Sequence, residues 1–276
     1  MKTAFTTLAC PELSLKELLD LASRNGMDAV EIRLGSGDTL CGYSLEALDE
    51  AKALFDQSGV ALSDLATGIT IKDGDRAVLS RMEHCAKMAQ RLGAVGIRIF
   101  LGRGAKYFTD PIDRDLDGVA AVLREGAELV AGYGVELWIE THSDYSTGAI
   151  LREVLDRTND SRVKVIWDVI HSVEWRESLE ETVRLIGDSI VHIHLKDGTA
   201  PADPNRTAYD LCALGAGDID ICAIAKVLRR IGYDGYLSLE WELMWHPELA
   251  ACYADTDALL GAYREWITPA LSYVCL

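Results

Sequence analysis

The stretch I-V-H-I-H-L-K-D, residues 190–197, alternates apolar and polar side chains, which is the pattern of a β-strand with two unlike faces. The polar face carries three ionisable side chains, His192, His194 and Lys196. Placing such groups on the inner face of a buried strand costs free energy unless each one is paired or binds a ligand. A metal ion would be such a ligand.

Three other apolar strands end in a carboxylate. Glu140 follows V-E-L-W-I, Asp168 follows V-K-V-I-W, and Glu240 follows Y-L-S-L. Together with His194, these side chains make a set of four metal-ligand types, each located where a hydrophobic strand ends. The function predicted below depends on this set.

Around these strands the chain alternates short β-branched runs with longer helical patterns. The expected strands are residues 3–8, 29–34, 60–66, 95–101, 135–141, 163–169, 190–196 and 236–241. The expected helices are a first one from the capping box at Ser14 to Gly26, then residues 45–58, 75–92, 113–133, 148–158, 179–186, 221–231 and 249–266.

Glycine closes most of these helices, and the βα unit recurs eight times. This pattern predicts an α/β protein with a single (β/α)₈ TIM barrel over residues 1–276. The alternative is a doubly wound open sheet, but no G-x-G-x-x-G motif follows the first strand.

Composition narrows the function classes. The chain has 276 residues, 49% of them hydrophobic, and a formal net charge of −17. A field of that sign repels phosphate backbones and argues against a nucleic-acid partner. We expect no membrane partner, because no run of eighteen apolar residues is present. The N-terminal residues resemble a first strand more than a signal peptide, so a cytoplasmic location is expected.

The seven cysteines are an odd number and none lies in a C-x-x-C motif. We therefore expect free thiols, as in a reducing cytoplasm, and no cysteine metal site.

In a TIM barrel the active site lies at the carboxyl ends of the strands. The ends of four consecutive strands would bring Glu140, Asp168, His194 and Glu240 to one rim. Each residue alone has a plainer interpretation, a helix cap or loop residue for a carboxylate and a core residue for the histidine. The set of four favours one divalent ion, Mn²⁺ first, with Mg²⁺, Co²⁺ or Zn²⁺ as alternatives.

Five segments resemble the xylose-isomerase-like barrel superfamily of sugar isomerases and epimerases, which includes ketose 3-epimerases, inosose isomerases and inosose dehydratases. They are W-I-E-T-H (138–142), W-D-V-I-H (167–171), H-I-H-L-K-D (192–197), L-G-A-G-D-I-D (214–220) and G-Y-D-G-Y-L-S-L-E-W-E (232–242). The first half of the chain resembles the family less, and G-M-D-A-V-E-I-R (26–33) and G-I-R-I-F-L-G (96–102) are only generic family-like strands.

The resemblance implies that Glu140, Asp168, His194 and Glu240 are the metal ligands, with Glu242 as the alternative to Glu240. It also implies that Glu140 and Glu240 act as the acid–base pair on the two faces of a bound sugar. The expected activity is a metal-dependent sugar or polyol isomerase or epimerase that moves a proton next to a carbonyl through an enediolate. A small sugar or cyclitol is the expected partner, and by analogy the family implies a homo-oligomer.

Candidate substrate contacts follow from position. By the resemblance, His171 in D-x-x-H contacts substrate oxygens; a buried structural histidine is the alternative. His142 lies either on the same rim or in a turn. Lys196 is a candidate to bind a substrate oxygen or to orient a metal ligand. The alternative is a surface lysine paired with Asp197.

Arg206, in the long loop 197–218, either binds a sugar oxygen or is a solvated loop residue. Trp245, past the last strand, is the best candidate for an aromatic wall against the C–H face of a sugar. Trp138 and Trp167 are expected in the layer between barrel and helices, and Trp241 stays open.

Three alternatives remain. A keto-cyclitol or keto-sugar dehydratase would use the same metal and the same first proton transfer. An apurinic-site endonuclease of the superfamily needs several extra histidines, whereas the chain has six in all and a charge of −17. A non-catalytic sugar-binding barrel would be expected to lack a ligand, and all four are present.

Overall fold

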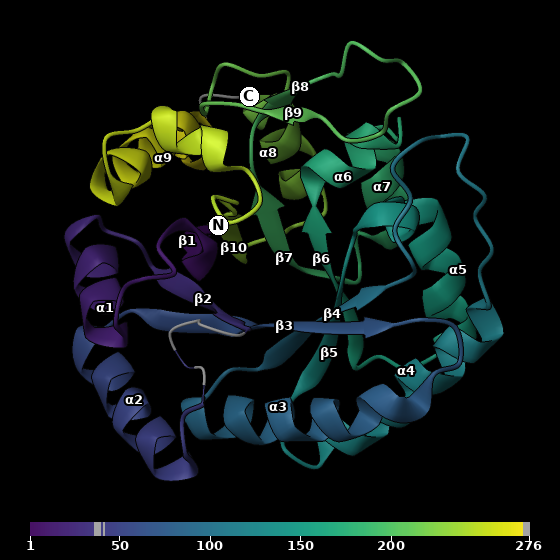
Figure 1. The fold of residues 1–276 in the computed structure, drawn as a ribbon, viewed down its shortest axis with the longest axis horizontal. Helices are drawn as coiled ribbons and strands as arrows, with labels where there is room; N and C mark the ends of the chain where they lie inside the picture. The colour runs from purple at the N-terminus through teal and green to yellow at the C-terminus, as the bar shows by residue number, and fades with distance from the viewer. Residues whose placement is uncertain (36–39, 41, 273–276) are drawn as a thin grey trace.

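The computed structural model describes residues 1–35, 40 and 42–272. Eight parallel strands close into a barrel in the order β1-β10-β7-β6-β5-β4-β3-β2, and the helices surround it (Figure 1). The barrel strands are β1 Lys2–Thr6, β2 Ala29–Leu34, β3 Ala61–Ile71, β4 Gly96–Leu101, β5 Glu136–Glu140, β6 Val163–Asp168, β7 Ile190–Leu195 and β10 Tyr236–Leu239. The predicted TIM-barrel fold is confirmed.

The α-helices are α1 Leu15–Arg24, α2 Leu45–Ser58, α3 Leu79–Leu92, α4 Leu116–Ala131, α5 Gly148–Thr158, α6 Val169–Glu174, α7 Leu179–Ile186, α8 Ile221–Arg230 and α9 Thr256–Leu271. Short 3₁₀ turns cover η1 Thr7–Ala9, η2 Arg76–Val78, η3 Ser143–Tyr145 and η4 Pro247–Ala251. The predicted capping box is present, because the Ser14 side chain accepts from the Glu17 amide and the Glu17 carboxylate accepts from the Ser14 amide. None of the helices in the described residues is both long and apolar enough to cross a bilayer.

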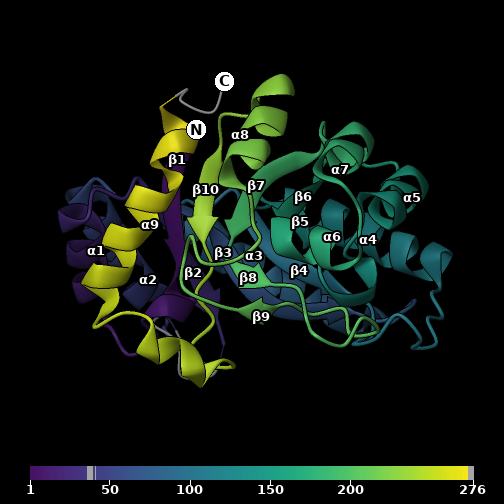
Figure 2. The ribbon, with the colours of Figure 1, turned by 90° about the horizontal axis from the view of Figure 1, so that it is seen from above.

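Two features of the fold were not predicted. Helix α6 begins directly after β6, where the sequence V-I-H-S-V-E still has the β-branched composition of a strand. Ser172 stabilises the turn there: its hydroxyl accepts from Trp167 Nε1 at 3.0 Å and donates to the Ser146 carbonyl at 2.8 Å. In the long loop, β8 Gly198–Thr199 pairs with β9 Asp210–Leu211, beyond the carboxyl ends of β7 and β10 (Figure 2).

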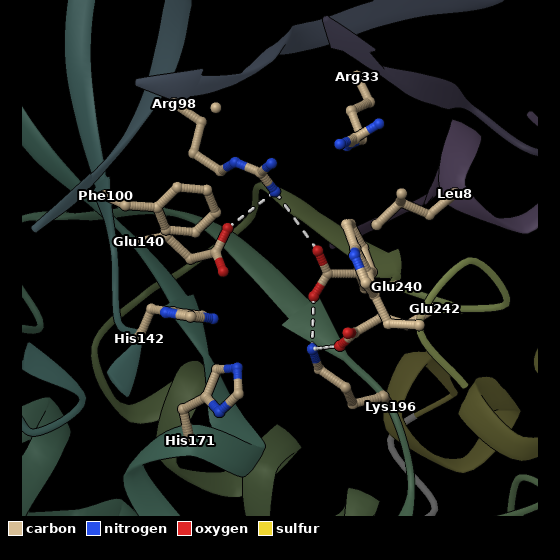
Figure 3. A pocket seen from close by; sticks show the side chains of 12 residues that line it. Leu8, Arg33, Arg98, Phe100, Glu140, His142, His171, Lys196, Glu240 and Glu242 are labelled. Atoms are coloured by element: carbon tan, nitrogen blue, oxygen red, sulfur yellow. Dashed lines mark hydrogen bonds and ion pairs between the residues drawn. The ribbon is translucent and has the colours of Figure 1, made fainter. Parts of the chain in front are cut away.

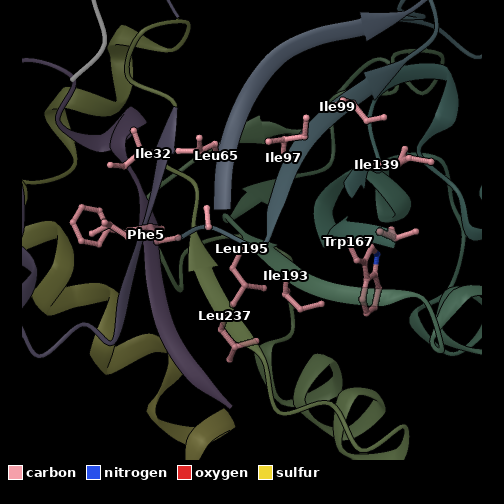
Figure 4. Packing of buried hydrophobic residues seen from close by; sticks show 14 of the residues in the cluster. Phe5, Ile32, Leu65, Ile97, Ile99, Ile139, Trp167, Ile193, Leu195 and Leu237 are labelled. Carbon is pink, nitrogen blue, oxygen red and sulfur yellow. The ribbon is translucent and has the colours of Figure 1, made fainter. Parts of the chain in front are cut away.

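The large core lies between the barrel and its helices. It holds the outward-facing side chains of the strands, among them Ile97, Ile139 and Trp167 (Figure 4). The prediction for Trp167 is therefore confirmed. Trp241 also belongs to this layer and packs on Tyr253, with ring centroids 5.4 Å apart.

The prediction for Trp138 is wrong. Trp138 and Glu140 are two residues apart on one strand, so both side chains point into the barrel. The indole lies over the ring of His192, with centroids 6.1 Å apart and planes 26° apart. It fits because Gly96 on the next strand has no side chain: a Cβ atom there would lie 2.2 Å from the indole.

Four cysteines are free thiols, namely Cys10, Cys85, Cys212 and Cys252. Cys222 is disulfide-bonded, so the expectation of free thiols is wrong for this residue. Cys41 and Cys275 lie outside the described residues.

Candidate active site

A cavity of about 380 Å³ opens at the carboxyl end of the barrel (Figure 3). It is lined by Leu8, Arg33, Gly68, Arg98, Phe100, Glu140, His142, His171, Lys196, Glu240, Glu242 and Trp245. Most of these residues lie at or just past the end of a strand. Alternate side chains of each strand point into the barrel, and the last of these inward side chains form the floor of the cavity.

The structure brings together the four side chains that the sequence predicts as metal ligands. One donor atom from each of Glu140, Asp168, His194 and Glu240 lies within 4.8 Å of the others. All four residues are buried, none with more than 4% of its surface exposed. They come from β5, β6, β7 and the residue after β10, four strands that are neighbours in the barrel.

The ring of His194 is oriented by hydrogen bonding on one side. Its Nε2 lies 2.7 Å from Oε2 of Glu31, on β2. Its Nδ1 lies 3.6 Å from Glu140 Oε2 and 3.5 Å from Glu240 Oε2. The ring therefore presents Nδ1 to the carboxylates of the rim.

Two cations neutralise part of this acidic cluster. Arg98 Nη1 lies 2.9 Å from Glu140 Oε2 and 3.4 Å from Glu240 Oε1. Lys196 Nζ lies 2.7 Å from Asp168 Oδ2 and 2.6 Å from Glu240 Oε2, and it also pairs with Glu242. The cations reach the cluster from different sides of Glu240, as Figure 3 shows.

The interpretation of Lys196 as a surface residue paired with Asp197 is wrong. Lys196 is 3% exposed and points into the cavity. Asp197 instead organises the following loop, since its carboxylate accepts hydrogen bonds from the backbone amides of Gly198, Gly215 and Gly217.

The donor set fits a divalent metal ion. Among the residues that the structure describes, Asp168 Oδ1 and His194 Nδ1 are buried and have no hydrogen-bond partner. Buried polar atoms are seldom left in that state, and each such atom calls for an explanation. The cluster also combines three carboxylates with one imidazole, a donor set that divalent ions such as Mn²⁺ and Mg²⁺ accept.

The two glutamates of the predicted acid–base pair sit in different electrostatic surroundings. Burial raises the pKa of Glu140 to about 7, although the guanidinium of Arg98 acts in the opposite direction. Burial also acts to raise the pKa of Glu240, but Lys196 and His194 outweigh it and hold that pKa well below its ordinary value. One environment thus favours the protonated carboxyl and the other the carboxylate, a separation found in acid–base pairs.

His171 and His142 both line the cavity. His171 Nδ1 pairs with Glu174 at 2.6 Å and its Nε2 lies 3.3 Å from Asp168 Oδ2. Burial acts to lower the pKa of His171, but Asp168 and Glu174 raise it to about 9. The ring of His142 lies 4.9 Å from both Phe100 and His171, and burial lowers its pKa to about 3.

Trp245 lines the mouth of the cavity and is about half exposed, and the Arg33 guanidinium carbon lies 5.1 Å from its ring centroid. Arg206 does not line this cavity. It pairs with Asp210 and lines a separate cavity with Arg176 and other residues.

Sequence reasoning assigned no role to Glu31, Arg33 or Arg98. The signal was present, because Glu31 and Arg98 are each an ionisable residue flanked by two apolar ones in a strand, as are His192 and His194. The sequence did not show that the side chains of Glu31 and Arg98 point into the barrel, because that direction depends on the register between strands.

Comparisons with known proteins identify the family and agree with the barrel fold. The model of the xylose isomerase-like TIM barrel family matches residues 19–260. The fold is similar to that of the IolI protein solved with a bound zinc atom, at a TM-score of 0.76 and 19% identity over 99% of this chain and 100% of that one. An L-ribulose 3-epimerase gives a TM-score of 0.76 at 20% identity, over 99% of this chain and 95% of the epimerase.

The probable 3-DHS dehydratase AsbF of Bacillus anthracis gives a TM-score of 0.75 at 18% identity, over 95% of this chain and 98% of AsbF. The chain also matches a fusion of a xylose isomerase-like TIM barrel with 4-hydroxyphenylpyruvate dioxygenase, at a TM-score of 0.69 and 20% identity. It covers 38% of that longer protein, while 87% of this chain is matched.

Proposed function

Because the chain belongs to the xylose isomerase-like TIM barrel family, we propose that it is a divalent-metal-dependent isomerase or epimerase of a sugar or polyol. The observation that carries this proposal is the buried cluster of Glu140, Asp168, His194 and Glu240, of which Glu140 and Glu240 line the cavity. A cluster of three carboxylates and an imidazole beside an open cavity is suited to hold a metal ion that a substrate can reach.

In this proposal the four residues hold one ion, Mn²⁺ first, with Mg²⁺, Co²⁺ or Zn²⁺ as alternatives. The zinc atom bound to IolI supports the view that a barrel of this family accepts such an ion. When bound, the ion would polarise a carbonyl and the hydroxyl beside it, so that the neighbouring C–H becomes more acidic.

The chain's own residues would then move the proton. Glu140 and Glu240 reach the cavity from β5 and from the end of β10, and Arg98 contacts both. One carboxylate removes the proton next to the carbonyl to give an enediolate, and the other returns it. If the two serve opposite faces of the substrate, the configuration at that carbon inverts.

The other lining residues would bind and orient the sugar. His142, His171 and Lys196 offer polar groups inside the cavity, and Trp245 offers an aromatic plane at its mouth. Arg206 would take part only if the long loop moved, because it lies in the neighbouring cavity.

NMR in D₂O tests this function. The Mn²⁺-loaded protein is incubated with a panel of ketoses and keto-cyclitols and removed before the spectra are recorded. We expect deuterium at a carbon next to the carbonyl, together with a new isomer. A Glu140→Gln variant should lose this exchange, and the matched control Glu136→Gln, on the same strand, should keep it.

Protein that holds metal and leaves every substrate of the panel unchanged would contradict the proposed substrate class. Protein that binds no divalent metal would contradict the proposal as a whole and favour the non-catalytic barrel.

A dehydratase is the second candidate. It is favoured by Glu242, a carboxylate that lines the cavity outside the cluster of four and pairs with Lys196. Such an additional group could assist the departure of a hydroxyl after the same first proton transfer. The same NMR experiment separates the two, because a dehydratase would give an enone or a diketone in place of an isomer.

A further inference from the structure

Glu31, on β2, carries a carboxylate that is fully buried inside the barrel and does not line the cavity. Its Oε2 lies 2.7 Å from His194 Nε2, 3.1 Å from His192 Nε2 and 3.5 Å from Ser238 Oγ. Its Oε1 lies 3.6 Å from Arg98 Nη1. One carboxylate thus contacts side chains from three other strands of the barrel.

Glu31, His192 and His194 carry donor atoms that are close enough together to suggest a second metal site. The distances favour direct hydrogen bonds instead. Two ligands of one tetrahedral ion, each about 2.0 Å from it, are roughly 3.3 Å apart, whereas Glu31 Oε2 and His194 Nε2 are separated by 2.7 Å. Arg98 also places a positive charge beside this carboxylate already.

The hydrogen bond to Glu31 determines which nitrogen of His194 is available to a metal. A neutral imidazole has one N–H donor and one lone pair, and a carboxylate can only accept. With the proton on Nε2 and donated to Glu31, the lone pair is on Nδ1, which faces Glu140 and Glu240. Carboxylates that hold the far nitrogen of a ligand histidine fix both its tautomer and its orientation.

Glu31 also contacts the guanidinium that bridges Glu140 and Glu240. Arg98 Nη1 lies 2.9 Å from Glu140 and 3.4 Å from Glu240, and Arg98 is 3% exposed. Buried charges of this kind keep their place only when they are paired. Glu31 therefore contacts both a predicted metal ligand and the cation between the predicted acid–base residues.

We propose that Glu31 is the positioning residue of this site: it holds His194 with Nδ1 toward the metal and holds Arg98 between Glu140 and Glu240. The inference rests on the metal-dependent function proposed above. It concerns a residue that contacts neither the substrate nor the ion.

Metal affinity tests the inference. The full chain, stripped with a chelator, is titrated with Mn²⁺, and free Mn²⁺ is measured by EPR. We expect Glu31→Ala to weaken the Mn²⁺ affinity about 10- to 100-fold, the usual effect of removing such a partner. Glu31→Gln, which keeps an oxygen acceptor but loses the charge, should lie between Glu31→Ala and wild type.

Asp144→Asn is the matched control. Asp144 is another buried carboxylate that does not line the cavity, and its Oδ1 accepts hydrogen bonds from the backbone amides of Arg103 and Gly104 at 3.2 and 3.0 Å. The affinity of this variant for Mn²⁺ should equal that of wild type. Thermal unfolding of the metal-free proteins shows whether each variant folds.

Nitrogen NMR of the wild-type protein keeps the inference testable even if the Glu31 variants do not fold. In ¹⁵N-histidine-labelled protein loaded with Zn²⁺, His194 should carry its proton on Nε2 and bind the metal through Nδ1. Metal bound through Nε2 would overturn the inference, and so would a folded Glu31→Ala variant with wild-type affinity. Wild-type protein that binds neither Mn²⁺ nor Zn²⁺ would instead overturn the proposed function, and the inference with it.

Discussion

Replacing Asp168 with alanine should abolish metal-dependent stabilisation while leaving the fold largely intact. Asp168 has no exposed surface, and burial raises the pKa of its carboxyl, so the carboxylate is disfavoured where it stands. Lys196 would keep Glu240 and Glu242 as partners after the change. The metal-free variant should therefore unfold at a temperature near that of metal-free wild type.

The size of the effect follows from linkage. An ion that binds only the folded state at 100 times its dissociation constant stabilises that state by about 2.7 kcal/mol. For a chain of 276 residues, each kcal/mol shifts the melting temperature by roughly 2 °C or somewhat more. Wild-type protein should therefore melt about 5 °C higher in saturating Mn²⁺ than in chelator, and Asp168→Ala should show no shift.

Differential scanning calorimetry with and without Mn²⁺ measures the melting temperature of each metal-free protein and its shift on metal binding. Asp144→Ala is the control, because Asp144 is also buried and lies outside the cluster of four. An Asp168→Ala variant with the full Mn²⁺-dependent shift would refute the ligand assignment. If Asp144→Ala lost the Mn²⁺-dependent shift as completely as Asp168→Ala, the shift would not depend on the cluster.

Other substitutions and a chemical probe test further parts of the structure. Glu240→Gln should retain some metal but lose proton exchange in D₂O, and normal turnover would remove Glu240 from the acid–base role. Gly96→Ala should lower the free energy of unfolding by about 1–3 kcal/mol in urea, because its Cβ would lie 2.2 Å from the Trp138 indole. Gly261→Ala lies inside α9, where the new Cβ would have no atom within 4 Å beyond its chain neighbours and the local helix backbone. It should instead raise the free energy of unfolding by about 0.4–1 kcal/mol. Equal effects of the two changes would contradict the packing argument. Burial raises the pKa of the Cys10 thiol to about 12, so Cys10 should react with a disulfide reagent only after unfolding, and fast labelling in native protein would show that it is accessible.

The charged interior has one physical cause. Side chains alternate along each barrel strand, so every second one points into the barrel. In this protein several of these inward positions carry charged groups. Arg98, Lys196 and Glu31 stay buried because each lies close to opposite charges or to hydrogen-bonding partners. The site is therefore a network in which several residues share partners, so that a change at one residue alters the contacts of others.

The sequence by itself determined the barrel and the floor of the site. The alternation of βα units predicted the fold, and the carboxylates and histidine at four strand ends predicted the cluster, because both follow from local periodicity and from the rule that strand ends converge. Period two also put His194 and Lys196 on one face of their strand, although for Lys196 it left a surface position beside Asp197 open as the alternative.

The tertiary structure alone decided which side chains meet across the barrel. Glu31 and His194 are separated by 163 positions in the chain, and Arg98 and Glu240 by 142, so no local pattern connects them. The inward direction of Trp138 depended on the space left by Gly96 on the neighbouring strand, and the position of Arg206 depended on the path of a long loop. Each of these contacts is set by register between strands and by loop closure, which are properties of the closed barrel as a whole.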